Sequence, residues 1–284
     1  MIPSSALSES KESSSRQTAV LNLAGVVPFS TVDWPGKIAA SVFAQGCPFR
    51  CHYCHNHEIL DPKVEGGASW QDVLDLLPRR KGLLDGVVFS GGEVLLQAIP
   101  PRGSKGVEDS PLGVALKQVK DLGFETGLHS SGSHPNLLRQ LLETGLVDWV
   151  GLDIKAMPDD YEYITGSPIG GKKAEASLAA LIDHPEVSHE VRMTLWPGIL
   201  RAPSVPFSEN LVDPKDGGDY LLDYAIDIAD WSFERGAKRF ALQRFQDTAA
   251  KEGSKGDNIP TVTWDDAEAC FRLQQIGFES VQVR

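Results

Sequence analysis

The sequence predicts an α/β protein in which a parallel sheet of six strand–helix units curls into a barrel or partial barrel. Short apolar segments alternate along the chain with helical patterns, as in successive βαβ units. Clusters of small and polar residues directly follow several apolar segments. Because barrels of this kind bind their ligands at the carboxyl ends of the strands, these clusters indicate one shared site.

Six apolar segments are predicted as strands, and six longer segments with helical periodicity follow them. The strands are expected at residues 38–45, 86–91, 125–130, 148–154, 190–196 and 239–245. The helices are expected near residues 69–78, 111–122, 135–144, 173–183, 219–235 and 264–276. The order implies a parallel sheet without an internal repeat beyond this alternation.

Two helix starts carry capping signals. Ser110 precedes Pro111, which suits a first helical turn, and Gly123 ends the same helix. Ser69 with Asp72 has the spacing of a capping box. We therefore expect both serines to cap helices.

Three cysteines within eight residues dominate the chemistry of the sequence. Cys47, Cys51 and Cys54 have the spacing C-x₃-C-x₂-C, with no fourth cysteine near enough to complete a local set. Structural zinc sites and four-cysteine clusters use four protein ligands. Three thiols instead indicate a [4Fe–4S] cluster whose fourth iron is free to bind a small molecule. A zinc site completed by a nearby histidine (His52, His55 or His57) and a chance grouping are the alternatives.

With Tyr53 before the third cysteine, the pattern resembles the signature of the radical S-adenosylmethionine (SAM) superfamily. GVVFSGGEVLLQ (86–97) resembles its Gly-Gly-Glu segment, and GLDIKAM (151–157) resembles its Asp-x-Lys segment. The flanks FSTVDWPGK (29–37), CHN (54–56) and LQRF (242–245) are similar to the anaerobic ribonucleoside-triphosphate reductase activating proteins, relatives of the pyruvate formate-lyase activating enzymes. The resemblance runs from about residue 23 to 245 and implies a partial (β/α)6 TIM-like barrel of the radical SAM type.

The resemblance implies an oxidoreductase with one [4Fe–4S] cluster and SAM. Reductive cleavage of SAM would give a 5′-deoxyadenosyl radical, which generates a glycyl radical on a partner enzyme. The expected partner is the anaerobic ribonucleotide reductase, and the electron would come from a low-potential donor such as flavodoxin or ferredoxin. One alternative is a radical SAM enzyme that acts on a small molecule, such as a deazapurine or a cofactor precursor. Another is a zinc-binding adaptor.

Cys47, Cys51 and Cys54 are the expected cluster ligands. The residues expected to contact SAM are Tyr53, Gly91, Gly92, Glu93, Ser130, Asp153, Lys155 and Arg192. The glycine backbone can approach a ligand closely, and Glu93 can pair with the ammonium group of SAM. Lys155 is expected at its carboxylate and Tyr53 against adenine, and Asp153 either binds the ribose or helps to shape the site. The alternatives are a simple glycine turn, a strand-end ion pair of Asp153 with Lys155, and ordinary packing of Tyr53.

The chain departs from its relatives after two strands. Val94 follows Glu93, where many superfamily members have proline. His129-Ser130-Ser131-Gly132 stands where glycyl-radical activating enzymes often have Asp-Thr-x-Gly. If that aspartate helps to bind a cation beside SAM, His129 cannot simply replace it. The site would then use a protonated imidazole or no cation.

Composition excludes several other classes of protein. The 39 acidic and 27 basic residues give a net charge of −12, which disfavours nucleic acid as a partner. No apolar run has the length of a membrane span, and the thiols fit a reducing, cytoplasmic location. Residues 1–20 are serine-rich and are expected to be a disordered tail. Residues 21–284 are expected to form one domain, with surface loop insertions near 98–110, 201–218 and 246–261.

Overall fold

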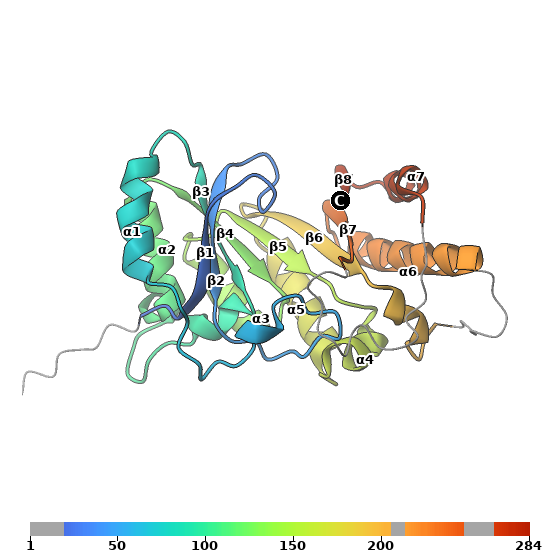
Figure 1. The fold of residues 1–284 in the computed structure, drawn as a ribbon, viewed down its shortest axis with the longest axis horizontal. Helices are drawn as coiled ribbons and strands as arrows, with labels where there is room; N and C mark the ends of the chain where they lie inside the picture. Colours follow the sequence, from blue (N-terminus) through green and yellow to red (C-terminus); the bar gives the residue numbers. More distant parts are fainter. Residues whose placement is uncertain (1–19, 206–213, 247–263) are drawn as a thin grey trace, which may run out of the picture.

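The computed structural model describes residues 20–205, 214–246 and 264–284. Its centre is an eight-stranded sheet with the strand order β1-β2-β3-β4-β5-β6-β7-β8, which follows the chain (Figure 1). The strands are β1 (Leu23–Ser30), β2 (Ala39–Ala44), β3 (Gly86–Gly91), β4 (Glu125–Ser130), β5 (Trp149–Asp153), β6 (Ser188–Leu195), β7 (Arg239–Arg244) and β8 (Ser280–Val283). Neighbours from β2 to β8 are parallel, so their carboxyl ends lie at one edge.

All six predicted strands are present, which confirms the α/β fold with a mostly parallel sheet. Two further strands, β1 and β8, extend the sheet at its two edges. β1 is antiparallel to β2 and contains Pro28, a residue that lacks the N–H of a central strand and therefore suits an edge. β8 has only four residues, and none of them is fully buried. A proline and a very short apolar run explain why neither strand was predicted.

The helices connect the parallel strands, and Figure 1 shows α1 and α2 at one end of the sheet and α6 and α7 at the other. They are α1 (Trp70–Leu76), α2 (Pro111–Asp121), α3 (Pro135–Glu143), α4 (Tyr161–Thr165), α5 (Gly170–Ile182), α6 (Pro214–Glu234) and α7 (Asp266–Ile276). Short 3₁₀ turns are η1 (His57–Ile59), η2 (Leu77–Arg80), η3 (Val94–Ala98), η4 (Val107–Asp109), η5 (Pro158–Asp160) and η6 (Pro197–Arg201). None of the helices in these ranges combines the length and apolarity needed to cross a bilayer.

The predicted loop insertions differ from the structure in two places. Residues 214–218 form the start of α6 rather than a loop, because Pro214 fits the first turn of a helix. The segment 98–110 includes η4, whose Val107 is buried. Residues 1–19 of the expected tail, 206–213 of the second insertion and 247–261 of the third lie outside the described residues.

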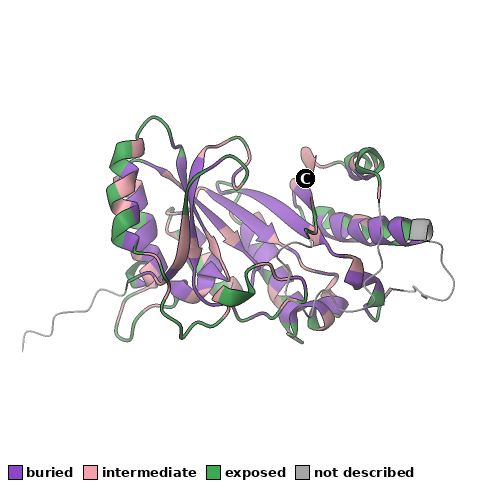
Figure 2. Cartoon of the chain, viewed as in Figure 1, coloured by how far each residue is buried: buried purple, intermediate pink, exposed green. Residues whose placement is uncertain are grey.

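The side chains of the central strands alternate between two buried faces, and Figure 2 shows these strands as almost entirely buried. In β3, Val87 and Phe89 join the large core under the helices, whereas Val88 faces the opposite, inner side. There Val88 belongs to a small cluster with Trp34 and Trp149, whose rings stack with centroids 5.4 Å apart. This apolar cluster lies below the polar residues that follow on the same face.

The two predicted helix caps have different outcomes. Ser110 caps α2, because its hydroxyl accepts a hydrogen bond of 3.0 Å from the N–H of Gly113. Ser69 stands at the N-cap of α1, but its side chain makes no capping hydrogen bond, so the predicted capping box is wrong. A capping box uses Glu or Gln at the third helical position, and the side chain of Asp72 is one methylene shorter.

Because Ser110 caps its helix and Ser69 does not, their removal should have different effects on stability. Ser110→Ala should lower the free energy of unfolding by about 1 kcal/mol, because it removes a buried cap. Ser69→Ala, the matched control, should change it by less than about 0.5 kcal/mol. Urea unfolding followed by circular dichroism measures both variants, and equal losses would contradict the assignment of the caps.

Candidate active site

The sequence motifs meet at one pocket of about 540 Å³ at the carboxyl ends of the parallel strands. This volume is within the range of sites for small molecules and cofactors. Every residue that was predicted to bind the cluster or SAM lines this pocket, except Glu93. The lining therefore joins residues that are more than 140 positions apart in the sequence, from Cys47 to Arg192.

The cysteine loop follows β2 and is held from both sides by backbone hydrogen bonds. The N–H of Cys47 donates to the carbonyl of Leu60 at 3.0 Å, and the N–H of Arg50 donates to the carbonyl of Thr165 at 2.9 Å. The guanidinium of Arg50 also donates to the carbonyl of Cys47 at 2.7 Å. These bonds fix the loop between the end of η1 and the end of α4.

The three thiols line the pocket and form no disulfide. Burial raises the pKa of Cys47 to about 12 and that of Cys51 to about 11, so both are protonated at neutral pH. A metal centre bound here would have to displace these protons. In the described ranges, no three His, Cys, Asp or Glu side chains are placed to hold a single metal ion.

The end of β3 passes very close to β2, and this requires glycine. Gly91 has φ = +119°, and a Cβ atom on it would lie 2.3 Å from the backbone nitrogen of Ala44. Gly92 continues this contact by donating a hydrogen bond to the carbonyl of Ala44 at 3.1 Å. The glycine pair therefore brings the β3 backbone to the pocket beside the cysteine loop.

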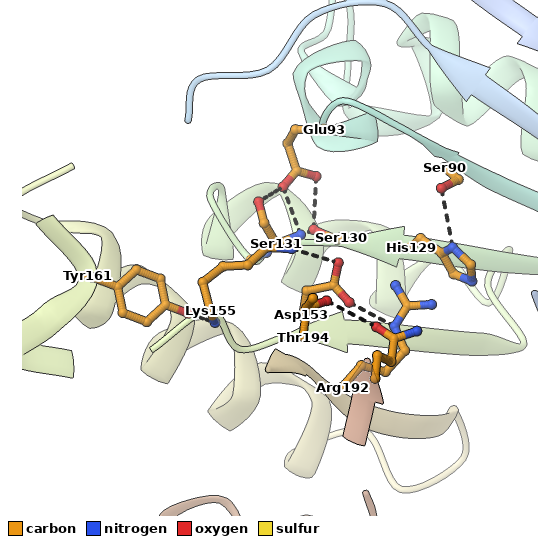
Figure 3. A network of polar contacts seen from close by, with 12 residues as sticks. Ser90, Glu93, His129, Ser130, Ser131, Asp153, Lys155, Tyr161, Arg192 and Thr194 are labelled. Atoms are coloured by element: carbon orange, nitrogen blue, oxygen red, sulfur yellow. Dashed lines mark hydrogen bonds and ion pairs between the residues drawn. The ribbon is translucent and has the colours of Figure 1, made fainter. Parts of the chain in front are cut away.

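Glu93 is fully buried and does not line the pocket. Its carboxylate accepts hydrogen bonds from the hydroxyl of Ser130 at 2.9 Å, from the N–H of Ser131 at 3.0 Å and from the hydroxyl of Ser131 (Figure 3). It also accepts from the N–H of Leu95 at 3.1 Å. Glu93 thus lies behind the two serines, which themselves line the pocket. In the structure the serines stand between the carboxylate and the cavity.

Asp153, Lys155 and Arg192 form a charged group on neighbouring strand ends (Figure 3). Asp153 accepts from the Nζ of Lys155 at 3.0 Å through one oxygen and from the Nε of Arg192 at 2.8 Å through the other. Burial alone would raise the pKa of Asp153, but the two cations hold it well below its usual range. Burial opposes the charge of Lys155, yet Asp153 raises its pKa well above the ordinary value. Asp153 and Lys155 thus form the strand-end ion pair that the sequence offered as an alternative to SAM binding. Both residues and Arg192 nevertheless line the pocket.

His129 is neutral and has both ring nitrogens occupied. Nε2 lies 2.7 Å from the carbonyl oxygen of Asp33, which can only accept, so Nε2 carries the proton. Nδ1 then accepts from the hydroxyl of Ser90 at 3.2 Å. Burial and the guanidinium of Arg192 lower the pKa of His129 to about 3. The contacts and the lowered pKa thus favour a neutral ring over the protonated imidazole considered from the sequence.

Tyr53 is buried, with its ring 5.9 Å from the ring of Trp196 and 5.9 Å from the Nζ of Lys155. Its ring contributes to the pocket wall, but its packing against Trp196 is the ordinary packing named as the alternative. The hydroxyl of Tyr53 is buried and makes no hydrogen bond within the described ranges.

The pocket also contains residues that the sequence did not single out. Asp33 enters from the loop before β2 and accepts a hydrogen bond of 2.6 Å from the hydroxyl of Ser41. Thr194 and Gln243 stand at the ends of β6 and β7. Only the family-like flanks 29–37 and 242–245 offered a signal for Asp33 and Gln243, and neither flank indicates a role by its chemistry.

A mostly parallel sheet with three cysteines and a charged cavity at the carboxyl ends of its strands is the arrangement of an α/β enzyme that binds its ligand there. The family model of the radical SAM superfamily matches residues 41–201, more than half of the chain. The chain therefore belongs to the radical SAM superfamily, and it is an enzyme.

Several curated relatives share parts of the sequence. A Methanocaldococcus jannaschii protein, provisionally named a glycyl-radical enzyme activating enzyme, is 28% identical over 63% of this chain and 70% of its own length. A pyruvate formate-lyase-activating enzyme of Clostridium pasteurianum is 33% identical over 58% of this chain and 65% of its own. The pyruvate formate-lyase 1-activating enzyme of Escherichia coli K12 is 32% identical over 46% of this chain, and the match spans half of that enzyme.

Among solved structures, TYW1 with a lysine-pyruvate adduct bound resembles the chain with a TM-score of 0.51. The two are 16% identical, and the match covers 85% of this chain and 74% of TYW1. This similarity concerns the fold alone and agrees with the mostly parallel sheet described above.

The geometry of His129 predicts a pH effect on stability. The unfolded chain binds a proton on His129 near its ordinary pKa of 6.5, whereas the folded protein binds it only near pH 3. Folding is therefore disfavoured as the pH falls through this window, by about 1.4 kcal/mol for each pH unit below 6.5. His129→Gln, which does not titrate, should lose about 1 kcal/mol less stability than the unmodified chain between pH 7.5 and 5.5.

Urea unfolding at both pH values measures this difference, and nitrogen-15 spectra of the histidine rings report the protonation directly. A His129 ring that becomes protonated in the folded protein above pH 5 would contradict the assigned hydrogen bonds.

Proposed function

We propose that the chain is a glycyl-radical enzyme activating enzyme that binds one [4Fe–4S] cluster and SAM in this pocket. The observation that carries the proposal is the meeting of three thiols with the strand-end residues of β3 to β6 around one cavity of about 540 Å³. The names of the curated relatives support the class of reaction. The matches span 50% to 70% of the length of these relatives.

The donor set fits an iron–sulfur cluster. Cys47, Cys51 and Cys54 are free thiols on one side of the cavity, and thiolates are the ligands of such clusters. Apolar side chains, Phe49 among them, line the same side and would limit solvent around the cluster. The zinc-binding adaptor loses its support, because the chain belongs to a superfamily of enzymes.

The rest of the pocket fits SAM. Lys155 and Arg192 offer cationic donors for its carboxylate, as charge-assisted hydrogen bonds. The Gly91-Gly92 backbone and the hydroxyl of Ser130 face the same cavity and suit the ammonium group. Glu93 would act on that group through Ser130 and Ser131, whose hydroxyls it binds. Asp153 would hold Lys155 and Arg192 in place, and the ring of Tyr53 would support this wall.

When bound and reduced, the cluster held by the three cysteines would supply the electron that cleaves SAM to methionine and a 5′-deoxyadenosyl radical, and this radical would take a hydrogen atom from a glycine Cα. The chain itself contributes orientation and exclusion of water. The Asp153–Arg192 pair fixes the cationic wall, and the buried Trp34–Trp149 stack closes the inner face below it.

The proposed partner is an anaerobic ribonucleotide reductase, because the flanks 29–37, 54–56 and 242–245 resemble the activating proteins of those reductases. The proposed electron donor is a flavodoxin or ferredoxin. A cytoplasmic location, where thiols stay reduced, also remains a prediction.

The cluster assignment makes the next prediction. Cys51→Ala should lose the iron–sulfur cluster and lower 5′-deoxyadenosine formation at least a thousandfold, because one of three thiolates is removed. The matched control is Cys270→Ala, since Cys270 lies in α7, away from the pocket lining. Iron and sulfide analysis after anaerobic reconstitution, with an assay of 5′-deoxyadenosine under dithionite, measures both. Full activity of Cys51→Ala would end the radical mechanism.

The partner assignment is tested with the reduced holoenzyme and SAM. Incubation with an anaerobic ribonucleotide reductase should give the doublet signal of a glycyl radical in electron paramagnetic resonance. A reductase whose radical-site glycine is replaced by alanine is the control and should give none. 5′-Deoxyadenosine formation stimulated by a small metabolite, without a signal from any glycyl-radical enzyme, would favour the small-molecule alternative.

A further inference from the structure

Arg192 lies on β6 beside Asp153 of β5, and its side chain lines the pocket. It is 5% exposed, and its Nε donates to Asp153. Its guanidinium also lies close enough to Asp33 and His129 to lower the pKa of both. The charge of arginine is permanent at any physiological pH. The wall of the pocket thus contains a fixed positive charge that belongs to the chain.

The backbone provides the space for this guanidinium. Gly151 precedes Asp153 by two residues on β5 and therefore faces the same side of the sheet. A Cβ atom on Gly151 would lie 2.9 Å from the Cζ of Arg192. A larger residue at position 151 would displace the guanidinium, so this glycine is part of the site.

Most of the charged and carbonyl oxygens nearest to this position are already bound by the protein, and the carboxylate of Asp33 accepts from the hydroxyl of Ser41. Both oxygens of Asp153 accept from cations, one from Lys155 and one from Arg192. The carbonyl of Asp33 accepts from His129, and the hydroxyl of Ser130 donates to Glu93. Alkali metal ions bind to oxygen donors, and carboxylate and carbonyl oxygens are the usual ones.

His129, which stands where glycyl-radical activating enzymes often have aspartate, is also unsuitable as a ligand for a cation. The Nδ1 atom of His129 accepts from the hydroxyl of Ser90 (Figure 3), and its Nε2–H donates to the carbonyl of Asp33. His129 therefore offers neither a negative charge nor a vacant lone pair. A cation beside SAM, which the resemblance to glycyl-radical activating enzymes raised, does not fit these residues.

We infer that the guanidinium of Arg192 takes the place of a monovalent metal ion in this site, so that SAM binding needs no alkali cation. The inference rests on the proposed binding of SAM, but not on the identity of the partner. The positive charges of Arg192 and Lys155 together offset the negative charges of Asp153 and Asp33, so the site requires no further cation.

The test compares SAM binding in different salts. The reconstituted holoenzyme is dialysed to equilibrium with labelled SAM in chloride buffers of equal ionic strength that contain potassium, sodium or N-methylglucamine. The dissociation constants should agree within about twofold, because the local cation is covalently part of the chain. A dissociation constant at least tenfold lower in potassium or sodium would overturn the inference. Absence of SAM binding in every buffer would overturn the proposed function, and this inference with it.

A variant provides a second readout. Arg192→Gln should weaken SAM binding in N-methylglucamine at least tenfold, and potassium or sodium should recover part of the loss, since one oxygen of Asp153 becomes available. Arg139→Gln is the matched control, because Arg139 pairs with Asp183 on the surface. It should bind SAM unchanged in all three salts. Unchanged binding by Arg192→Gln would overturn the inference, and if that variant does not fold, the salt comparison on the unmodified chain decides.

Discussion

The buried carboxylate of Glu93 connects the parts of the site that the chain must hold together. It is fully buried at the end of β3, and its acceptor oxygens are occupied by Leu95, Ser130 and Ser131. A buried charge without such partners would cost several kcal/mol. Its own N–H donates to the carbonyl of Gly46, directly before the cysteine loop. One residue therefore joins the ends of β2, β3 and β4, and the pocket depends on that junction.

The inner face of the sheet changes from apolar to polar along each strand. Val88 and Trp149 lie in the small apolar cluster with Trp34, whereas Ser90 and Asp153, two and four residues further on, line the pocket. Because side chains on one face repeat every second residue and the strands are parallel, the change occurs at the same level in each strand. The polar wall of the pocket thus lies above an apolar floor. Because an apolar surrounding has a low dielectric constant, this floor strengthens the electrostatic interactions above it.

The sequence allowed the fold and most of the pocket to be predicted, because both depend on local patterns. Strands were visible from apolar runs, and the cysteines, Gly91-Gly92 and Asp153–Lys155 from fixed spacing. The remainder depends on contacts between distant segments. The hydrogen bond between Asp33 and His129 joins residues 96 positions apart, and the one between Glu93 and Ser131 joins residues 38 positions apart. Neither contact could therefore be derived from the sequence. The same limit explains the missed edge strand β1, whose Pro28 contradicts the pattern of a central strand.

The wall of the pocket comes from residues inside and outside the segment that matches the superfamily model. The cysteines, the glycine pair and the Asp153–Arg192 group lie within residues 41–201, which match the superfamily model. Val32, Asp33, Gln243 and Arg284 also line the pocket but lie outside that match. The segment that matches the superfamily model therefore does not complete the pocket by itself. A chain limited to residues 41–201 would lack β7 and Asp33, and with them part of the wall.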